Sequence, residues 1–147
     1  MEKLTEKDLN FDLKADTQKE ALHALAEQAF ERGKIADTEI FYQELCNREK
    51  ESTTGFGNGV AIPHARHSVV QEAGILVARC KNNLEWNSMD GEPVNVCICL
   101  IAPDDQNDFH LKTLAKISRR MIHDDFIDTL KNASEADVLA EINKVIE

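Results

Sequence analysis

The sequence is poor in positive charge and in long apolar runs. Lys and Arg total 17 against 27 Asp and Glu, which gives a formal net charge of −10 at pH 7. Nucleic acids and anionic membranes bind proteins through basic surfaces, so this balance argues against both as direct partners. The longest apolar run, Val96 to Ala102, is far shorter than the roughly 20 residues that a membrane-spanning helix needs.

Cysteine is also scarce, and its spacing excludes a zinc-binding pair. The four cysteines include no C-x-x-C motif. Cys97 and Cys99 lie two residues apart in a strand-like run, so both should face one side of a sheet as small core side chains. The first residues lack the apolar core of a signal peptide. We therefore expect a cytoplasmic protein with free thiols.

Length and composition are those of an ordinary globular domain. The chain has 147 residues, of which 42% are apolar and 30% charged. A chain of this size buries roughly two-thirds of its unfolded surface and needs no disulfide or metal to hold its core. We expect one domain over residues 1–147, since domains average about 150 residues.

Capping residues and apolar periodicity predict two helices near the start of the chain. After a short alternating strand at Leu9–Leu13, the segment Thr17–Glu20 has the pattern of a capping box. Apolar residues then recur at helical spacing until Gly33, a typical helix stop. Asp37 can cap a second helix that runs to about Glu51.

The middle of the chain has the patterns of strands. Ala73–Cys80 is a strand candidate, and Leu84–Trp86 is a second, shorter one. Met89–Gly91 has the composition of a turn, which favours a hairpin. Val94–Ala102 is almost continuously apolar, as expected of a central strand that is covered on both faces.

Helical periodicity returns after Pro103. The first predicted helix has several residues at helical spacing on one face. A short helix follows, and Ser134 begins the last helix. Helices thus flank the strands on both sides in sequence, and the hairpin is combined with helical crossovers. This predicts an α/β fold with three α/β/α layers around a central mixed sheet. The shared face of the first of these helices consists of His110, Leu114, Ile117 and Met121.

The most unusual stretch runs from Arg48 to Arg66. Within it, Ser52–Gly59 is rich in loop formers and has three alternating glycines, and a short apolar run then leads to Pro63 and His64. No Gly-Lys-Ser/Thr ends the glycine-rich part, so it is not a phosphate-binding P-loop. The spacing G-x-G-x-x-G is also absent, which argues against dinucleotide binding.

His64 is the first candidate for chemistry. A neutral imidazole is a good nucleophile near pH 7, and histidine is among the side chains that form covalent intermediates. Such a role needs one free ring nitrogen, with the other held by a hydrogen bond. Arg48, Thr54 or a helix N-terminus could bind the oxygens of an incoming phosphoryl group. On the residues alone, an ordinary surface or turn histidine is the more common explanation of such a position.

A metal site is a further alternative. The spacing His64-x-x-His67 could place two ligands on one face of a helix, with His110 or His123 completing the set. The pair lacks the carboxylate of the H-E-x-x-H motif, and short H-x-x-H pairs are common by chance. His110 by itself fits a partly buried histidine on the core-facing side of the first turn of its helix.

The stretch from Arg48 resembles the signature of enzyme IIA domains of the fructose/mannitol type, from the bacterial phosphoenolpyruvate-dependent sugar phosphotransferase system. In that signature the motif R-E is followed by S-T-G-x-G-x-G-[IV]-A-[IL]-P-H. The matching residues here are Arg48-Glu49 and Thr53–His64. Thr53 occupies the place where the family often has serine. The resemblance extends to nearly the whole chain through Leu84–Trp86, Met89–Pro103 and His110–Ser118.

The resemblance implies a role for each matching residue. His64 would be the phosphoryl acceptor, through Nε2, and His110 would be a second active-site histidine near the phosphate. Arg48 would neutralise phosphoryl charge, and Thr54 would supply a nearby hydroxyl. The implied fold is a mixed sheet between helical layers, and the reaction needs no metal, nucleotide or other cofactor.

The resemblance also implies partners. A phosphotransferase component of this kind takes a phosphoryl group from the histidine phosphocarrier protein as a phosphohistidine intermediate. It passes the group to a cysteine of a sugar-specific IIB domain, and its association with the membrane is indirect, through a IIC component. Nitrogen-related IIA proteins share the motif but act by phosphorylation-dependent binding to other proteins, and this regulatory role is the alternative.

Overall fold

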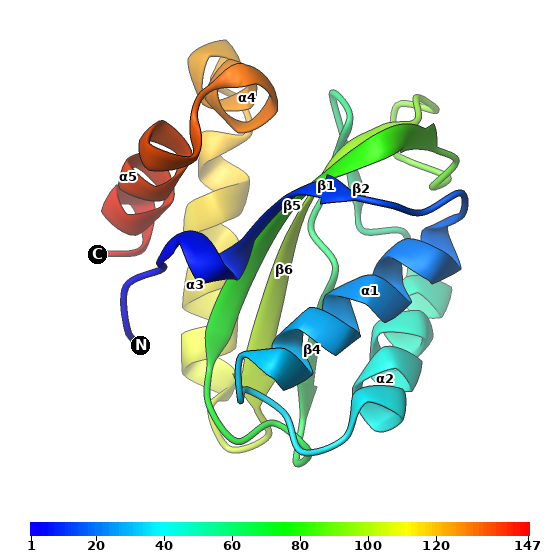
Figure 1. Ribbon diagram of the computed structural model, residues 1–147, viewed down its shortest axis with the longest axis vertical. Helices are drawn as coiled ribbons and strands as arrows, with labels where there is room; N and C mark the ends of the chain where they lie inside the picture. Colours follow the sequence, from blue (N-terminus) through cyan, green and yellow to red (C-terminus); the bar gives the residue numbers. More distant parts are fainter.

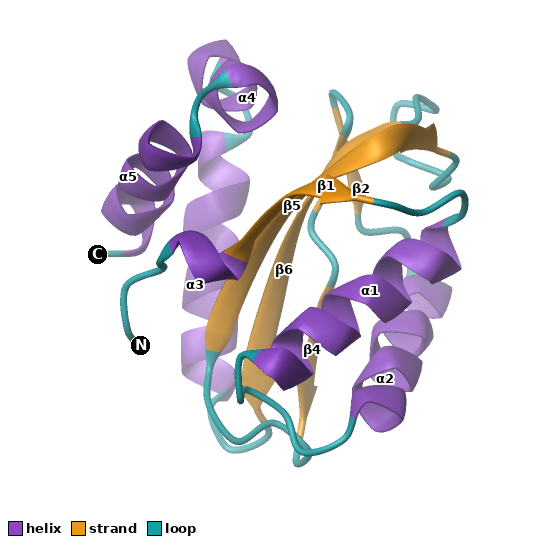
Figure 2. Ribbon diagram, viewed as in Figure 1, coloured by secondary structure: helices purple, strands orange, loops and turns teal.

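A six-stranded sheet lies between two layers of helices. The computed structural model describes residues 1–147. Figures 1 and 2 show two helices, α1 (Gln18–Glu31) and α2 (Thr38–Glu51), on one face of the sheet. The other face is covered by α3 (Asn107–Arg120), α4 (Asp124–Asn132) and α5 (Glu135–Ile146). This is the predicted three-layer α/β/α fold. No helix is both long and apolar enough to cross a membrane.

The sheet is mixed, with β6 at its centre. Strand β6 pairs antiparallel with β5 and parallel with both β3 and β4, while β1 pairs parallel with β5 and β2 pairs antiparallel with β3. This confirms the prediction that the apolar run Val94–Ala102, which forms most of β6, is the central strand. The strands are β1 (Leu9–Leu13), β2 (Gly55–Gly57), β3 (Val60–Ala61), β4 (His64–His67), β5 (Gly74–Leu84) and β6 (Val94–Pro103).

Two apolar cores hold the layers together, one on each face of the sheet. One core joins the sheet to α1 and α2 and includes Phe41, Cys97 and Cys99; the other joins it to α3, α4 and α5 and includes Ile98. Cys97 and Cys99 share a face, as predicted. The helices are α1 (Gln18–Glu31), α2 (Thr38–Glu51), α3 (Asn107–Arg120), α4 (Asp124–Asn132) and α5 (Glu135–Ile146), and a 3-10 turn covers Glu6–Asp8.

The helix caps are those predicted from the sequence, with one difference. The side chains of Asp37 and Ser134 cap α2 and α5, and Thr17 accepts the N–H of Glu20 at the start of α1. The capping box predicted there is incomplete, because the Glu20 carboxylate accepts the N–H of Asp16 rather than that of Thr17. Either bond satisfies an otherwise free N–H, so the start of α1 is unchanged.

Two strand predictions needed correction. Ala73–Cys80 and Leu84–Trp86 were expected as separate strands, but β5 is continuous from Gly74 to Leu84, with an irregularity in its pairing between Arg79 and Leu84. The polar residues between them interrupt the apolar pattern, yet pairing along β6 carries the strand through. The loop-like segment before Val60 likewise contains a strand, β2, which pairs with β3 in a hairpin.

Candidate active site

His64 is the first residue of β4 and lies between two hollows of the surface. Pro63 precedes it, and His64 pairs in register with Leu100 of the central strand. Only 7% of the residue is exposed. The ring nevertheless lines a pocket of about 390 Å³ and a smaller one of about 160 Å³, so it can be reached from outside.

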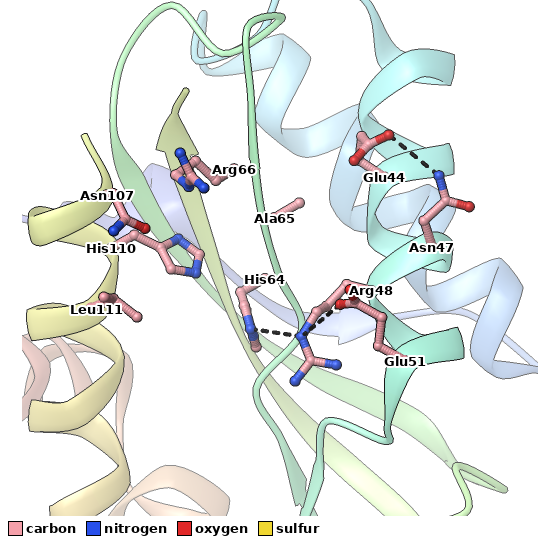
Figure 3. Close-up of a pocket in the computed structure, with 10 residues that line it drawn as sticks. All are labelled: Glu44, Asn47, Arg48, Glu51, His64, Ala65, Arg66, Asn107, His110 and Leu111. Atoms are coloured by element: carbon pink, nitrogen blue, oxygen red, sulfur yellow. Dashed lines mark hydrogen bonds and ion pairs between the residues drawn. The ribbon is translucent and has the colours of Figure 1, made fainter. Parts of the chain in front are cut away.

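Both ring nitrogens of His64 have partners, and these agree on one tautomer. Nδ1 lies 2.8 Å from the carbonyl oxygen of Ile62, which can only accept, so Nδ1 carries the proton. Nε of Arg48, which can only donate, lies 3.1 Å from Nε2. Nε2 is therefore unprotonated, and its lone pair accepts a hydrogen bond from the guanidinium group (Figure 3). This is the tautomer that a nucleophile acting through Nε2 requires.

The surroundings keep His64 neutral. Burial lowers its pKa below the ordinary value of 6.5, and the positive charge of Arg48 lowers it further, against the opposing effect of the hydrogen bond to Ile62. At pH 7 the imidazole is therefore mostly unprotonated and able to attack an electrophile.

Arg48 comes from the last turn of α2 and is held in place from several sides. Its Nη1 donates to the carbonyl oxygen of Ser52 at 2.7 Å, and its Nε lies 3.8 Å from a carboxylate oxygen of Glu51. A cation in the last turn of a helix is also favoured by the helix dipole. The contact between Arg48 and His64 was not deducible from their separation of 16 residues, because it depends on how α2 packs on the sheet.

His110 approaches from the other side of the pocket, in the first turn of α3. Its ring centroid lies 5.1 Å from that of His64, and its Nδ1 is buried without a hydrogen-bond partner. Burial lowers the pKa of His110 to about 4, and the charges of His64, Arg66 and Arg48 contribute. A neutral His110 can offer a hydrogen bond to a group bound at His64, but it does not add positive charge.

Thr54 lies on the second, smaller pocket, and its hydroxyl is already engaged. It donates to the carboxylate of Glu49 in a short hydrogen bond and accepts one from Nε1 of Trp86 at 3.4 Å. The structure thus brings Thr54 near His64 but directs its hydroxyl toward α2. A direct bond from this hydroxyl to a phosphoryl group would require a rearrangement.

The metal alternative does not fit the geometry. It needed His64 and His67 on one helical face, but both lie on β4, where residues three apart face opposite sides. Nδ1 of His67 accepts the N–H of Val69 instead. No group of three or more His, Cys, Asp or Glu side chains in the chain is close enough to hold a metal ion.

The sequence analysis assigned no role to two residues that line the larger pocket, nor to the carboxylate that holds Thr54. Arg66 and Asn107 line the larger pocket with His64 and His110. Arg66 follows His64 by two residues, so strand periodicity would have placed both on one face had His64–His67 been interpreted as a strand. Glu49 lay inside the signature, but its link to Thr54 depends on tertiary packing.

The family to which the chain belongs is clear from comparisons with known proteins. Residues 2–145 match the family described as "Phosphoenolpyruvate-dependent sugar phosphotransferase system, EIIA 2". A fructose-like EIIA component of this system from Escherichia coli is 34% identical, with 99% of each chain covered. A nitrogen regulatory protein from Bradyrhizobium diazoefficiens is 35% identical over 88% of this chain and 84% of its own length.

One relative is much longer than this chain. A 2-O-alpha-mannosyl-D-glycerate-specific EIIABC component from E. coli is 32% identical over 92% of this chain, which spans 21% of the relative's length. This match therefore does not assign the activities of that whole protein to this chain.

Solved structures share the fold. The nitrogen regulatory protein IIA-Ntr from Neisseria meningitidis aligns with a TM-score of 0.85 at 24% identity, covering 97% of this chain and 95% of that one. The IIA component in a complex of IIA and phosphorylated IIB of the mannitol system from E. coli aligns with a TM-score of 0.80 at 20% identity, covering 97% of both. The match over residues 2–145 and the fructose-like relative from E. coli establish that the chain belongs to the EIIA 2 family of the phosphoenolpyruvate-dependent sugar phosphotransferase system.

Proposed function

We propose that this chain is a phosphocarrier whose His64 takes a phosphoryl group on Nε2 from the histidine phosphocarrier protein and passes it to a IIB cysteine. The observation that carries the proposal is the tautomer of His64. Nδ1 donates to the carbonyl oxygen of Ile62, and Nε2 keeps its lone pair beside Arg48. This arrangement supports attack by Nε2 on a phosphorus atom.

Each transfer exchanges one bond to phosphorus for another. In the first, the Nε2 lone pair forms the new N–P bond while the N–P bond of the donor phosphohistidine breaks and its electron pair returns to the donor ring. In the second, a thiolate of IIB forms an S–P bond and the electron pair of the N–P bond returns to His64. Charge and position decide the rates of both steps, because little other chemistry is asked of the protein.

Three residues would assist the transfer in different ways. Arg48 would leave Nε2 and pair with the phosphoryl oxygens, which neutralises their charge. Neutral His110 would donate a hydrogen bond to the same group. Thr54 would act indirectly, because its hydrogen bond to Glu49 fixes the loop before β2 beside the smaller pocket.

The acceptor cysteine is expected outside these 147 residues. Cys97 and Cys99 are fully buried, and burial raises the pKa of Cys99 to about 12. Cys46 and Cys80 are only partly exposed. A partner of this kind is documented for the mannitol IIA component, whose structure is known in complex with phosphorylated IIB.

The proposal extends to the chain's organisation and location. Residues 1–147 would act as one IIA unit, since both histidines and Arg48 come from elements that pack on a single sheet. The reaction would take place in the cytoplasm, and contact with the membrane would be indirect, through IIC.

The second candidate is a regulatory role. It is favoured by the nitrogen regulatory protein that is 35% identical to this chain. Phosphorylation of His64 would then change the charge at the pocket and so the binding of another protein. Transfer to a IIB domain separates the two roles, since only the carrier must pass its phosphoryl group onward at a useful rate.

The test is a phosphorylation assay with phosphoenolpyruvate, enzyme I and the histidine phosphocarrier protein. We expect one phosphate per chain, stable in alkali and labile in acid, and no label in a His64→Ala variant. A His123→Ala variant serves as a control, because His123 lies at the start of α4, outside both pockets. A full label on the His64→Ala variant would contradict the proposal.

A further inference from the structure

We propose that Glu49 is a positioning residue that sets the tautomer of His64 through Thr54 and Ile62. The inference rests on the proposed function, in which Nε2 of His64 is the reacting atom. It concerns the other ring nitrogen, Nδ1, and explains how a carboxylate that does not touch His64 decides where its proton lies.

The first link joins α2 to the start of β2. The carboxylate of Glu49 accepts the N–H of Thr54 at 3.0 Å on one oxygen and the Thr54 hydroxyl on the other. Nε1 of Trp86 can only donate, and it bonds to the Thr54 hydroxyl oxygen at 3.4 Å. The hydroxyl hydrogen is thereby directed at Glu49, so Thr54 is held by both its main chain and its side chain.

The second link runs across the hairpin of β2 and β3. The carbonyl oxygen of Thr54 accepts the N–H of Ile62 at 2.9 Å. The carbonyl oxygen of Ile62 in turn accepts the Nδ1 proton of His64 at 2.8 Å. Thr54, Ile62 and His64 are all more than nine-tenths buried, so water is poorly placed to replace a lost partner.

These links let one helix end control both nitrogens of the same ring. Arg48 and Glu49 are adjacent in the last turn of α2. Arg48 bonds to Nε2 directly, whereas Glu49 acts on Nδ1 through the hydrogen bonds of Thr54 and Ile62. The two contacts demand the same proton placement, with hydrogen on Nδ1 and a lone pair on Nε2.

Without this chain of bonds only the contact of Arg48 with Nε2 would still favour a proton on Nδ1. A histidine ring in water favours the tautomer with the proton on Nε2, which has no lone pair there for attack. If the Ile62 carbonyl turns away, that inactive tautomer becomes accessible. Loss of Glu49 should therefore reduce the reactive population even though Arg48, His64 and His110 are all present.

The test measures the tautomer and the reaction separately. In protein labelled with ¹⁵N at histidine, the shifts and proton couplings of the His64 ring nitrogens at pH 8 report which nitrogen is protonated. We expect Nδ1–H in the wild type and an Nε2–H population in Glu49→Ala and Glu49→Gln. Phosphorylation by the phosphocarrier should slow by on the order of 10- to 100-fold, because fewer His64 rings would carry the lone pair on Nε2 in the position that attack requires.

Two comparisons separate positioning from simple loss of stability. Glu39→Gln is the matched control, because its carboxylate lies on the same helix, is 68% exposed, bonds to His23 rather than to Thr54 and lines neither pocket. It should keep the Nδ1–H tautomer. Thr54→Ser keeps both bonds to Glu49 and should behave like the wild type, whereas Thr54→Val loses the hydroxyl and should resemble Glu49→Gln.

The inference is overturned if His64 stays fully in the Nδ1–H form in Glu49→Ala, or if Thr54→Val matches the wild type in both tautomer and rate. Should Glu49→Ala fail to fold, the comparison of Thr54→Val with Thr54→Ser decides. The NMR measurement needs no phosphoryl donor. A wild-type chain that is not phosphorylated would therefore refute the proposed function while leaving the tautomer result to be judged by itself.

Discussion

Arg48 covers one ring nitrogen of His64: its Nε lies 3.1 Å from Nε2 and points its hydrogen at the lone pair. The guanidinium group thus occupies the place that a phosphoryl group on Nε2 would need. Under the proposed function, Arg48 would therefore change partners during each transfer, from the imidazole to the phosphoryl oxygens.

Replacing Arg48 by Ala should slow phosphorylation of His64 by on the order of 100-fold, the usual effect of removing one stabilising donor from a site of charged transition states. The fold should survive, because the Arg48 side chain is 27% exposed and lies outside both apolar cores. Arg48→Lys should recover only part of the rate, since it offers a different donor geometry. Stopped-flow transfer kinetics beside circular dichroism check this, and a wild-type rate in Arg48→Ala would contradict the role.

The rate of phosphorylation should depend on pH through His64. Its pKa lies below 6.5, so the reactive neutral form predominates at pH 7 and above, and the rate should fall as the pH decreases through the folded-state pKa. Arg48→Gln removes a positive charge that lowers this pKa. The pKa should therefore rise and the profile should move to higher pH. NMR signals of the His64 ring carbons, followed as the pH is changed, measure this pKa. An unchanged or lower pKa in Arg48→Gln would contradict the prediction.

Stability should also decline in acid because of the histidines. The pKa of His110 is about 4 in the folded chain, below the ordinary 6.5, so the unfolded chain binds more protons between these values. The free energy of unfolding should therefore increase as the pH rises from about 4 to 6.5. In His110→Gln this dependence should be weaker. Urea titrations at several pH values test the difference, and identical slopes for the two proteins would count against a depressed pKa.

Exposed apolar side chains beside the two pockets should serve partner binding. Leu111 is 55% exposed and lines the larger pocket, and Met89 is 77% exposed and lines the smaller one, both together with His64. Changing either to Ser should raise the KM for the phosphocarrier about tenfold, equivalent to roughly 1.4 kcal/mol, with no loss of stability. Ile122→Ser is the control, because Ile122 is 79% exposed and lines neither pocket. Equal KM values in all variants would exclude this role.

Gly55 should tolerate no side chain. A Cβ at this position would lie 2.8 Å from the backbone Cα of Ser88, so the neighbouring chain would have to move. Gly55→Ala should lower the free energy of unfolding by about 1 to 3 kcal/mol, and it should disturb the adjacent Thr54. Gly33→Asn is a suitable control, since a Cβ there meets open space and asparagine tolerates positive φ. Urea unfolding distinguishes the two, and equal stability would argue against the close approach.

Local signals in the sequence predicted most of the elements. Asp37 and Ser134 cap helices because their side chains accept a nearby N–H, an interaction within a few residues. The continuous apolar run at Val94–Ala102 indicated the centre of the sheet, because a strand covered on both faces has no side that faces water. The break expected after Cys80 was wrong, since pairing with β6 extends β5 across a polar segment.

The candidate site was predicted in part. The signature singled out His64, and the resemblance named Arg48, His110 and Thr54. The structure places all of these residues on one or both of two pockets, and their roles in phosphoryl transfer stay predictions. The metal alternative depended on helical spacing at His64 and His67, and strand pairing with β6 removes it.

The order of residues along the chain was sufficient to predict the layers of the fold and to single out the stretch that carries the candidate histidine. Capping, periodicity and turn formation act over a few neighbouring residues, so they can be inferred from the sequence alone. Only the tertiary structure decided which nitrogen of His64 holds the proton, which residues enforce it and how far its pKa is lowered. Those properties arise from burial and from contacts between α2, the hairpin and β4, and such contacts exist only once the helices are packed on the sheet.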